Sequence, residues 1–169
     1  GGRVAGEIGP MKTSHSKRRF GSRAGSSMVE FALGSGVLVA AFTFTFQYGF
    51  IFYQYNALFN AVNNGAHFGA LQTYDTDNTT PSTAFSNAIK NMVVYGDPTG
   101  TATSPVVRGL TTSNVNVSIG SVGTNNTTFA PTSVTVSISN YTINGVIGNF
   151  TLSGKPAVTY PFQGLFTPY

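Results

Sequence analysis

The sequence has no cysteine and few charged residues. Without cysteine the chain has no disulfide framework, no thiolate zinc site and no cysteine nucleophile. Charged residues make up 8% of its 169 residues, against about 25% in an average soluble domain. Disorder caused by charge repulsion is therefore not expected. The length predicts one domain of ordinary size, or a small domain with an appended segment.

The few charges are unevenly distributed. Residues 1–25 hold six of the nine basic residues and one acid, while residues 26–169 hold three basic residues and four acids. Nucleic-acid binding needs basic residues spread over a folded face, so no nucleic-acid partner is expected. Residues 1–25 are interpreted as a basic leader. Met11 is expected to be the biological start, with residues 1–10 as upstream sequence outside the fold.

One uncharged run dominates the chain. Phe31 to Tyr55 contains no charged residue, and about 20 apolar residues are enough to cross a membrane as a helix. Residues 42–52 alternate with period 2, as a strand does, but the run is several times too long for a strand. A helix is therefore predicted, with a plain membrane anchor or a buried core helix as the simpler interpretations. The basic leader predicts a cytoplasmic N-terminus by the positive-inside rule.

Read as a helix, this run carries two kinds of contact surface. Its small residues fall on one row that permits close helix–helix approach: Ala32, Gly36 and Ala40. Its aromatic residues form stripes at i, i+4 spacing, one of which is Phe42, Phe46 and Phe50. The sequence predicts that these residues pack against other helices.

A carboxylate stands at the start of the apolar run. Glu30 is surrounded by Met28, Val29 and Phe31, and a carboxylate at membrane depth is costly and usually functional. A glutamate near a helix N-terminus is also favoured by the helix dipole. Considered alone, Glu30 is equally consistent with this purely stabilising role.

The order of residues around Glu30 resembles the processing site of type IV prepilins. A basic leader precedes Gly25, four residues separate Gly25 from Glu30, and Phe31 opens the apolar run. In that family a membrane-bound prepilin peptidase cuts after the glycine, and the glutamate becomes the fifth residue of the mature chain. The resemblance implies cleavage between Gly25 and Ser26, with Glu30 and Phe31 serving in assembly.

The segment is similar to one branch of that family, the TadE-type pilus proteins of the tight-adherence system. Arg23–Leu33 looks like their opening, and Gly65-Ala66-His67-Phe68 stands where they carry a Gly-Ala-Arg-aromatic motif. His67 replaces the arginine, so the role of that arginine does not carry over. The resemblance covers residues 23–70.

The resemblance implies a non-enzymatic filament subunit without a cofactor. Its partners would be other pilin subunits, the prepilin peptidase, an inner-membrane assembly platform, and the membrane before assembly. The precursor would lie in the inner membrane and the mature subunit in an extracellular filament, as a major or a minor component. Cleavage would free an amine on Ser26 that can pair with Glu30 of a neighbouring subunit. This pairing would be favoured because an unpaired carboxylate in a dry bundle costs several kcal/mol. A monomeric, signal-anchored surface binding domain remains the alternative.

The remaining sequence predicts an α+β fold of pilin-like type. The long helix is expected to cover residues 26–71, followed by an extracytoplasmic domain at 72–169 that folds alone. A short second helix is predicted at 82–95 with Ser82 as its cap. Alternating residues predict an antiparallel sheet of about four strands, with turns at Gly123–Asn126, Asn140, Asn144-Gly145 and Ser153-Gly154. Asn144-Gly145 is the best hairpin signal.

The sequence offers no recognisable catalytic group. His67 stands alone and is interpreted as a packed or surface side chain, and a serine–histidine–acid triad cannot be built from so few acids. Asp75 and Asp77 alternate as in a calcium loop but lack its glycine and downstream glutamate. A polar turn is therefore predicted there, and no metal site.

Overall fold

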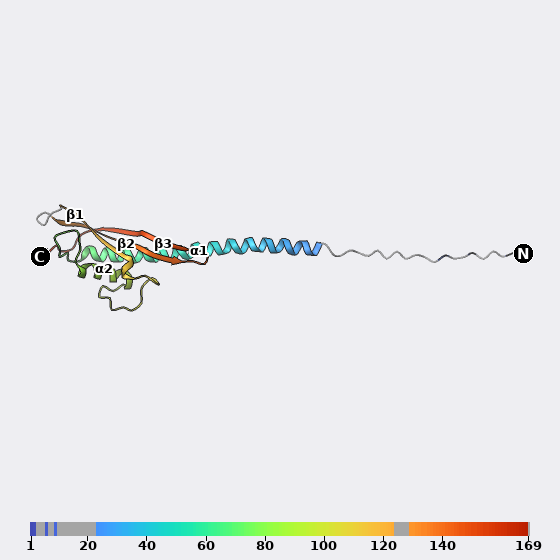
Figure 1. Ribbon diagram of the computed structural model, residues 1–169, viewed down its shortest axis with the longest axis horizontal. Coiled ribbons are helices and arrows are strands. Elements are labelled where there is room, and N and C mark those ends of the chain that lie inside the picture. The colour runs from blue at the N-terminus through green and yellow to red at the C-terminus, as the bar shows by residue number, and fades with distance from the viewer. Residues whose placement is uncertain (3–5, 7–8, 10–22, 124–128, 169) are drawn as a thin grey trace. The chain divides into compact units, whose positions relative to one another are not determined.

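The computed structural model describes residues 1–2, 6, 9, 23–123 and 129–168. Most of the basic leader, Met11 and part of the predicted 123–126 turn lie outside the described residues. The elements follow the order α1 (Arg23–Leu71), α2 (Thr83–Tyr95), the 3-10 turn η1 (Thr112–Asn114), β1 (Val115–Val122), β2 (Ala130–Asn144) and β3 (Asn149–Pro161) (Figure 1). This confirms the predicted α+β class, with a long helix, a short helix and an antiparallel sheet.

The chain divides into two units, Gly1–Phe42 and Thr43–Tyr169. In the first unit, every described side chain from Gly25 to Phe42 is exposed except Ser35, which is half-buried. The hydroxyl of Ser35 donates to the carbonyl of Ala32 at 3.0 Å. This part of α1 is therefore helical without any covering from described residues.

In the second unit, α1 has a buried face. Leu58, Val62, Ala66 and Ala70 recur every four residues and are all buried, as expected for one face of a helix. Leu58, Val62 and Ala66 of this stripe join one hydrophobic core together with buried side chains of α2 and of the three strands. The sheet lies along this half of α1 (Figure 1).

Helix α2 has the predicted ends. The Ser82 side chain accepts the backbone N–H of Phe85 at 3.2 Å, and Gly96 closes the helix in the left-handed conformation. Its buried face, which includes Ile89 and Val93, packs against α1. The approach is closest at Gly65, where an added Cβ would overlap the Val93 side chain. Gly65 therefore allows the two helices to come into contact.

Substituting Gly65 tests this close approach. Overpacking lowers the free energy of unfolding by about 1–3 kcal/mol, whereas replacing a glycine inside a helix by a better helix former raises it by about 1 kcal/mol. Gly65→Leu should therefore lower the free energy of unfolding, by up to about 2 kcal/mol. Gly49→Leu is the matched control, because a Cβ on Gly49 meets nothing within 4 Å. Denaturant unfolding of the full chain in detergent measures both, and equal stability of the two variants would contradict the packing described.

The sheet is a three-stranded antiparallel meander in the order β1-β2-β3. Val117 pairs with Val136, and Val136 pairs with Val158. The predicted hairpin is confirmed: Asn144 pairs with Asn149, and residues 145–148 form the turn. Strand β2 ends at Asn144.

The prediction of about four strands is wrong by one. Asn140 and Gly154 lie inside strands with positive φ values of 56° and 71°, and the β2–β3 register shifts next to Asn140. In β2 the buried positions change phase there, from Ile138 to Tyr141. A bulge moves the strand by one residue and so keeps both segments facing the core. The turn-forming residues mark this bulge, and no chain reversal occurs at either of them.

Because α1 supplies core residues, we expect residues 72–169 to need part of it. A fragment 54–169 keeps Leu58, Val62, Ala66 and Ala70, whereas a fragment 72–169 loses all four buried side chains. Each large buried aliphatic side chain contributes about 1.5–3 kcal/mol, against a total stability of about 5–15 kcal/mol. Amide dispersion should show 54–169 folded and 72–169 unfolded. A folded fragment 72–169 would contradict this expectation and support the domain boundary at residue 72 that the sequence predicts.

Candidate membrane and assembly segment

The predicted cleavage bond lies at the start of α1. Gly25 and Ser26 are the third and fourth residues of the helix and are exposed. An added Cβ on Gly25 would meet nothing within 4 Å, so no contact among described residues requires glycine here. Helix ends fray at low cost, so the predicted bond lies in a part of the helix that can unwind readily.

Glu30 is exposed on the same helix. Its neighbours Val29 and Phe31 are 61% and 78% exposed. The carboxylate thus stands among apolar side chains that no other described part of the chain covers. If this surface enters a dry environment, the carboxylate needs a cation from another molecule.

The predicted packing residues are on the surface. Phe42 and Phe46 are 72% and 63% exposed, and Phe50 is 39% exposed. Ala32, Gly36 and Ala40 are exposed as well. In the part of the chain that the structure describes, one helix is long and apolar enough to cross a membrane, and none of its most apolar window is buried. The alternative of a buried core helix is therefore wrong for this window.

The structure adds Gln47, which the sequence analysis did not assign. It is only 7% exposed, although its neighbours Phe46 and Tyr48 are exposed. Its side-chain oxygen accepts the N–H of Val146 at 2.6 Å, and its side-chain nitrogen donates to the carbonyl of Gly148 at 3.4 Å. The one signal in the sequence was a polar amide inside an uncharged run. Gln47 attaches the β2–β3 turn to α1.

Gly145 has a role in the same contact. A Cβ at this position would overlap the Gln47 amide and approach the Gly148 carbonyl. The backbone N–H of Gly145 donates to that carbonyl at 3.1 Å. The glycine of the Asn144-Gly145 pair therefore allows the turn to come close to α1.

Removing the Gln47 amide should loosen this turn. Gln47→Leu keeps the size and helix propensity but leaves the Val146 N–H without its partner, which costs about 1–3 kcal/mol. Amide exchange at Val146 should therefore accelerate about tenfold or more, while exchange in α2 stays unchanged. Gln72→Leu, outside the attachment, is the control. Unchanged exchange at Val146 would show that the turn is held by other contacts.

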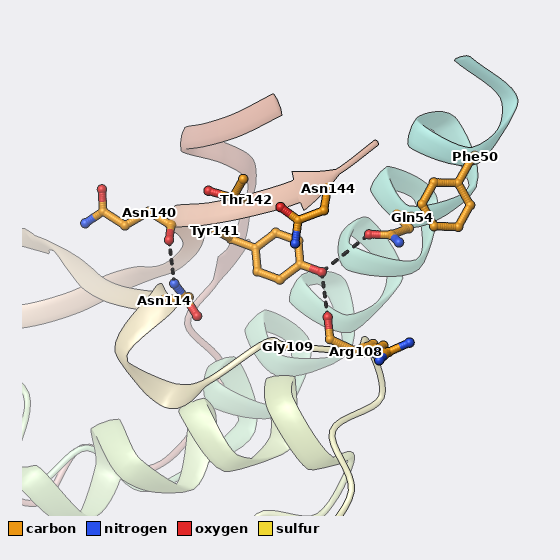
Figure 2. Close-up of a pocket in the computed structure, with 9 residues that line it drawn as sticks. All are labelled: Phe50, Gln54, Arg108, Gly109, Asn114, Asn140, Tyr141, Thr142 and Asn144. Carbon is orange, nitrogen blue, oxygen red and sulfur yellow. Dashed lines mark hydrogen bonds between the residues drawn. The ribbon is translucent and has the colours of Figure 1, made fainter. Parts of the chain in front are cut away.

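A cleft of about 500 Å³ lies beside this attachment, between α1, β2 and the segment before η1 (Figure 2). The Tyr141 hydroxyl donates to the Arg108 carbonyl at 2.8 Å and lies 3.4 Å from the Gln54 side-chain oxygen. The Asn114 amide donates to the Asn140 carbonyl at 2.9 Å. Burial raises the pKa of Tyr141, so its hydroxyl remains a neutral donor. The described residues that line the cleft include no carboxylate or imidazole, so they offer no acid–base pair.

The other residues singled out by the sequence lie apart from this segment. His67 is exposed and meets the ring of Tyr160 edge-on, with ring centroids 5.4 Å apart. Asp75 and Asp77 belong to the predicted polar turn, where the Thr80 N–H donates to the Asn78 side-chain oxygen at 2.8 Å. Among the described residues, no three histidine or acidic side chains gather as a metal site would require.

Comparison with known families gives a match in the N-terminal part of the chain. The family described as TadE-like protein matches residues 25–67, which confirms the predicted resemblance over these residues. This is a structural, non-enzymatic family of proteins associated with tight-adherence pili. Comparisons with curated proteins and with solved structures returned no match.

Proposed function

From the TadE-like segment at residues 25–67 we propose that this chain is a structural subunit of an extracellular tight-adherence-type pilus. The observation that carries the proposal is the uncovered apolar helix, with Glu30 near its start, joined to a folded domain. The subunit would be made as a precursor in the inner membrane with its N-terminus in the cytoplasm. It would then be cut between Gly25 and Ser26 by a prepilin peptidase.

The helix suits two dry environments in succession. In the bilayer its exposed side chains, such as Phe31 and Phe42, contact lipid. In a filament core the same surface contacts helices of other subunits, with Ala32, Gly36 and Ala40 allowing close approach. Because both surroundings are apolar, the subunit can pass from one to the other without refolding, handed over by an inner-membrane assembly platform.

Glu30 would set the axial register between subunits. Cleavage after Gly25 creates an ammonium group on Ser26, and Glu30 of the neighbouring subunit is its partner. A slipped arrangement leaves two charges unpaired in a dry core, at a cost of about 3–5 kcal/mol. Correctly spaced subunits therefore have lower energy than slipped ones.

The competing function is a monomeric surface binding domain held by an uncleaved anchor. It is favoured by the polar cleft lined by Tyr141 and Arg108, a feature that filament packing does not require. The two functions differ in where the protein is found. A pilus subunit appears in filaments sheared from the cell surface, whereas an anchored monomer stays in the membrane fraction.

Fractionation of the native host tests the proposal. Cells are sheared, and the chain is quantified by immunoblot in purified filaments and in membranes. We expect chain in the filaments that disappears when the inner-membrane assembly platform is deleted. Chain confined to membranes in both strains would contradict the proposed function and favour the monomeric domain.

A further inference from the structure

The tip of the β2–β3 hairpin is apolar and exposed. Its turn reads Gly145-Val146-Ile147-Gly148, with Val146 75% and Ile147 50% exposed. Turns that face water are usually built from polar residues and glycine. Phe150, just after the turn, is 51% exposed and widens this apolar tip.

The hairpin points along α1 toward the apolar run. Tyr160 near the end of β3 donates to Asn63 of α1 at 3.0 Å, Tyr141 of β2 lies near Gln54, and the turn itself is bound by Gln47. Of these three contacts, the one at the tip lies nearest to Thr43, where this unit of the chain begins.

The tip and the helix form one apolar surface. Two shallow grooves flank the Gln47 contact: one is lined by Phe46, Phe50 and Val146, the other by Phe44, Tyr48 and Ile147. Phe44, Phe46 and Tyr48 are 51%, 63% and 71% exposed. The surface is thus continuous from α1 onto the hairpin, with the polar side chain of Gln47 buried beneath the tip.

The position of the tip matches the edge of a bilayer. A helix needs about 20 apolar residues to cross the hydrocarbon core, so a span that begins at Phe31 ends near Phe50. The tip is bound at Gln47, within one turn of that end. It therefore falls where hydrocarbon gives way to lipid headgroups.

Charged groups around the tip fit this placement. Arg108 is exposed at the cleft and lies at the level of Gln54 through Tyr141. Gln54 is seven residues beyond Gln47, about 10 Å along a helix, and the headgroup layer on each side is about 5–8 Å thick. The sequence has no acidic residue between Glu30 and Asp75, nor after Asp97. Nothing charged on the hairpin opposes contact with an anionic lipid surface.

We propose that the β2–β3 tip, Val146, Ile147 and Phe150, inserts into the outer surface of the bilayer that α1 crosses, with Arg108 facing the lipid phosphates. This inference rests on the membrane-anchored precursor of the proposed function. The tip seats the folded domain on the membrane before assembly, and Gln47 fixes its depth. Extraction into a filament then removes the tip from lipid together with the helix.

Depth-dependent fluorescence quenching tests the inference on the full chain. The protein has no cysteine, so a single cysteine can carry the fluorophore at Ile147, Leu165 or Val37. Leu165 is the matched control, an exposed apolar residue bonded through its carbonyl to Tyr74 beyond the far end of α1. Val37 lies inside the apolar run and reports insertion of the helix. The vesicles hold equal amounts of phosphatidylethanolamine and phosphatidylglycerol. A nitroxide lipid labelled near the headgroup reports on Ile147 and Leu165, and one labelled in the acyl chain reports on Val37.

We expect the label at Ile147 to be quenched and the label at Leu165 to remain bright. If the Ile147 label stays as bright as the Leu165 label while the Val37 label is quenched, the helix is inserted but the tip does not touch lipid. That result would contradict this inference and leave the membrane anchor of the proposed function intact. A bright label at Val37 as well would overturn the anchor of the proposed function. Efficient bismaleimide crosslinking between two Ile147→Cys chains would assign the tip to a second copy and contradict the lipid contact.

Discussion

Glu30→Ala is expected to leave membrane insertion and cleavage intact and to remove most of the subunit from filaments. The substitution makes the helix more apolar, so insertion is not impaired. In a filament it leaves the Ser26 ammonium group of the neighbouring subunit buried without a partner, at about 3–5 kcal/mol. Subunit in sheared filaments, normalised to processed subunit in membranes, should fall about tenfold or more.

Two variants separate charge pairing from other effects of Glu30. Glu30→Gln keeps the size and hydrogen-bonding capacity without the charge, and should give an intermediate loss. Val29→Ala is the control, because it changes an adjacent exposed side chain and leaves the carboxylate in place. Wild-type assembly of Glu30→Ala would show that Glu30 acts only as a favourable residue near a helix N-terminus.

Gly25→Leu is expected to block processing and, with it, assembly. A peptidase that cuts after glycine has no room for a large side chain next to the bond, and the uncut leader keeps five net positive charges at the helix start. Moving such charges into a dry core costs about 2.5–3.5 kcal/mol each even in a membrane. The precursor should accumulate in the membrane, and mature subunit should be absent from filaments.

The matched control for this change is Gly34→Leu, which alters another glycine of α1 whose added Cβ meets nothing within 4 Å. It should be cut normally. Because Gly25 makes no close contact in the structure, Gly25→Leu should not alter the stability of the folded domain. Normal processing of Gly25→Leu would mean that this bond is not the cleavage site.

The sequence predicted the elements whose signals are local. The uncharged run, Ser82 and Asn144-Gly145 are each local signals, and α1, α2 and the β2–β3 hairpin are present as predicted. The number of strands was wrong because Asn140 and Gly154 favour the same left-handed backbone in a bulge as in a turn. Only the pairing across the strands distinguishes the two.

Long-range contacts could not be read from local patterns. Gln47 bonds to residues about a hundred positions away, and in the sequence it is an isolated amide in an apolar run. Gly65 belongs to a sequence motif, but glycine is needed there because a larger residue would overlap the Val93 side chain of α2. The membrane and assembly residues stay a prediction: their side chains lie uncovered on α1, and their pattern in the sequence is set by the helix alone.

The most direct test of the account is the N-terminal sequence of the chain recovered from filaments sheared off the native host. We predict a mature chain that begins at Ser26, with Glu30 as its fifth residue. A chain in filaments that begins at Met11, or at a residue beyond Phe31, would contradict both the cleavage and the pairing of Glu30 with a neighbouring amine.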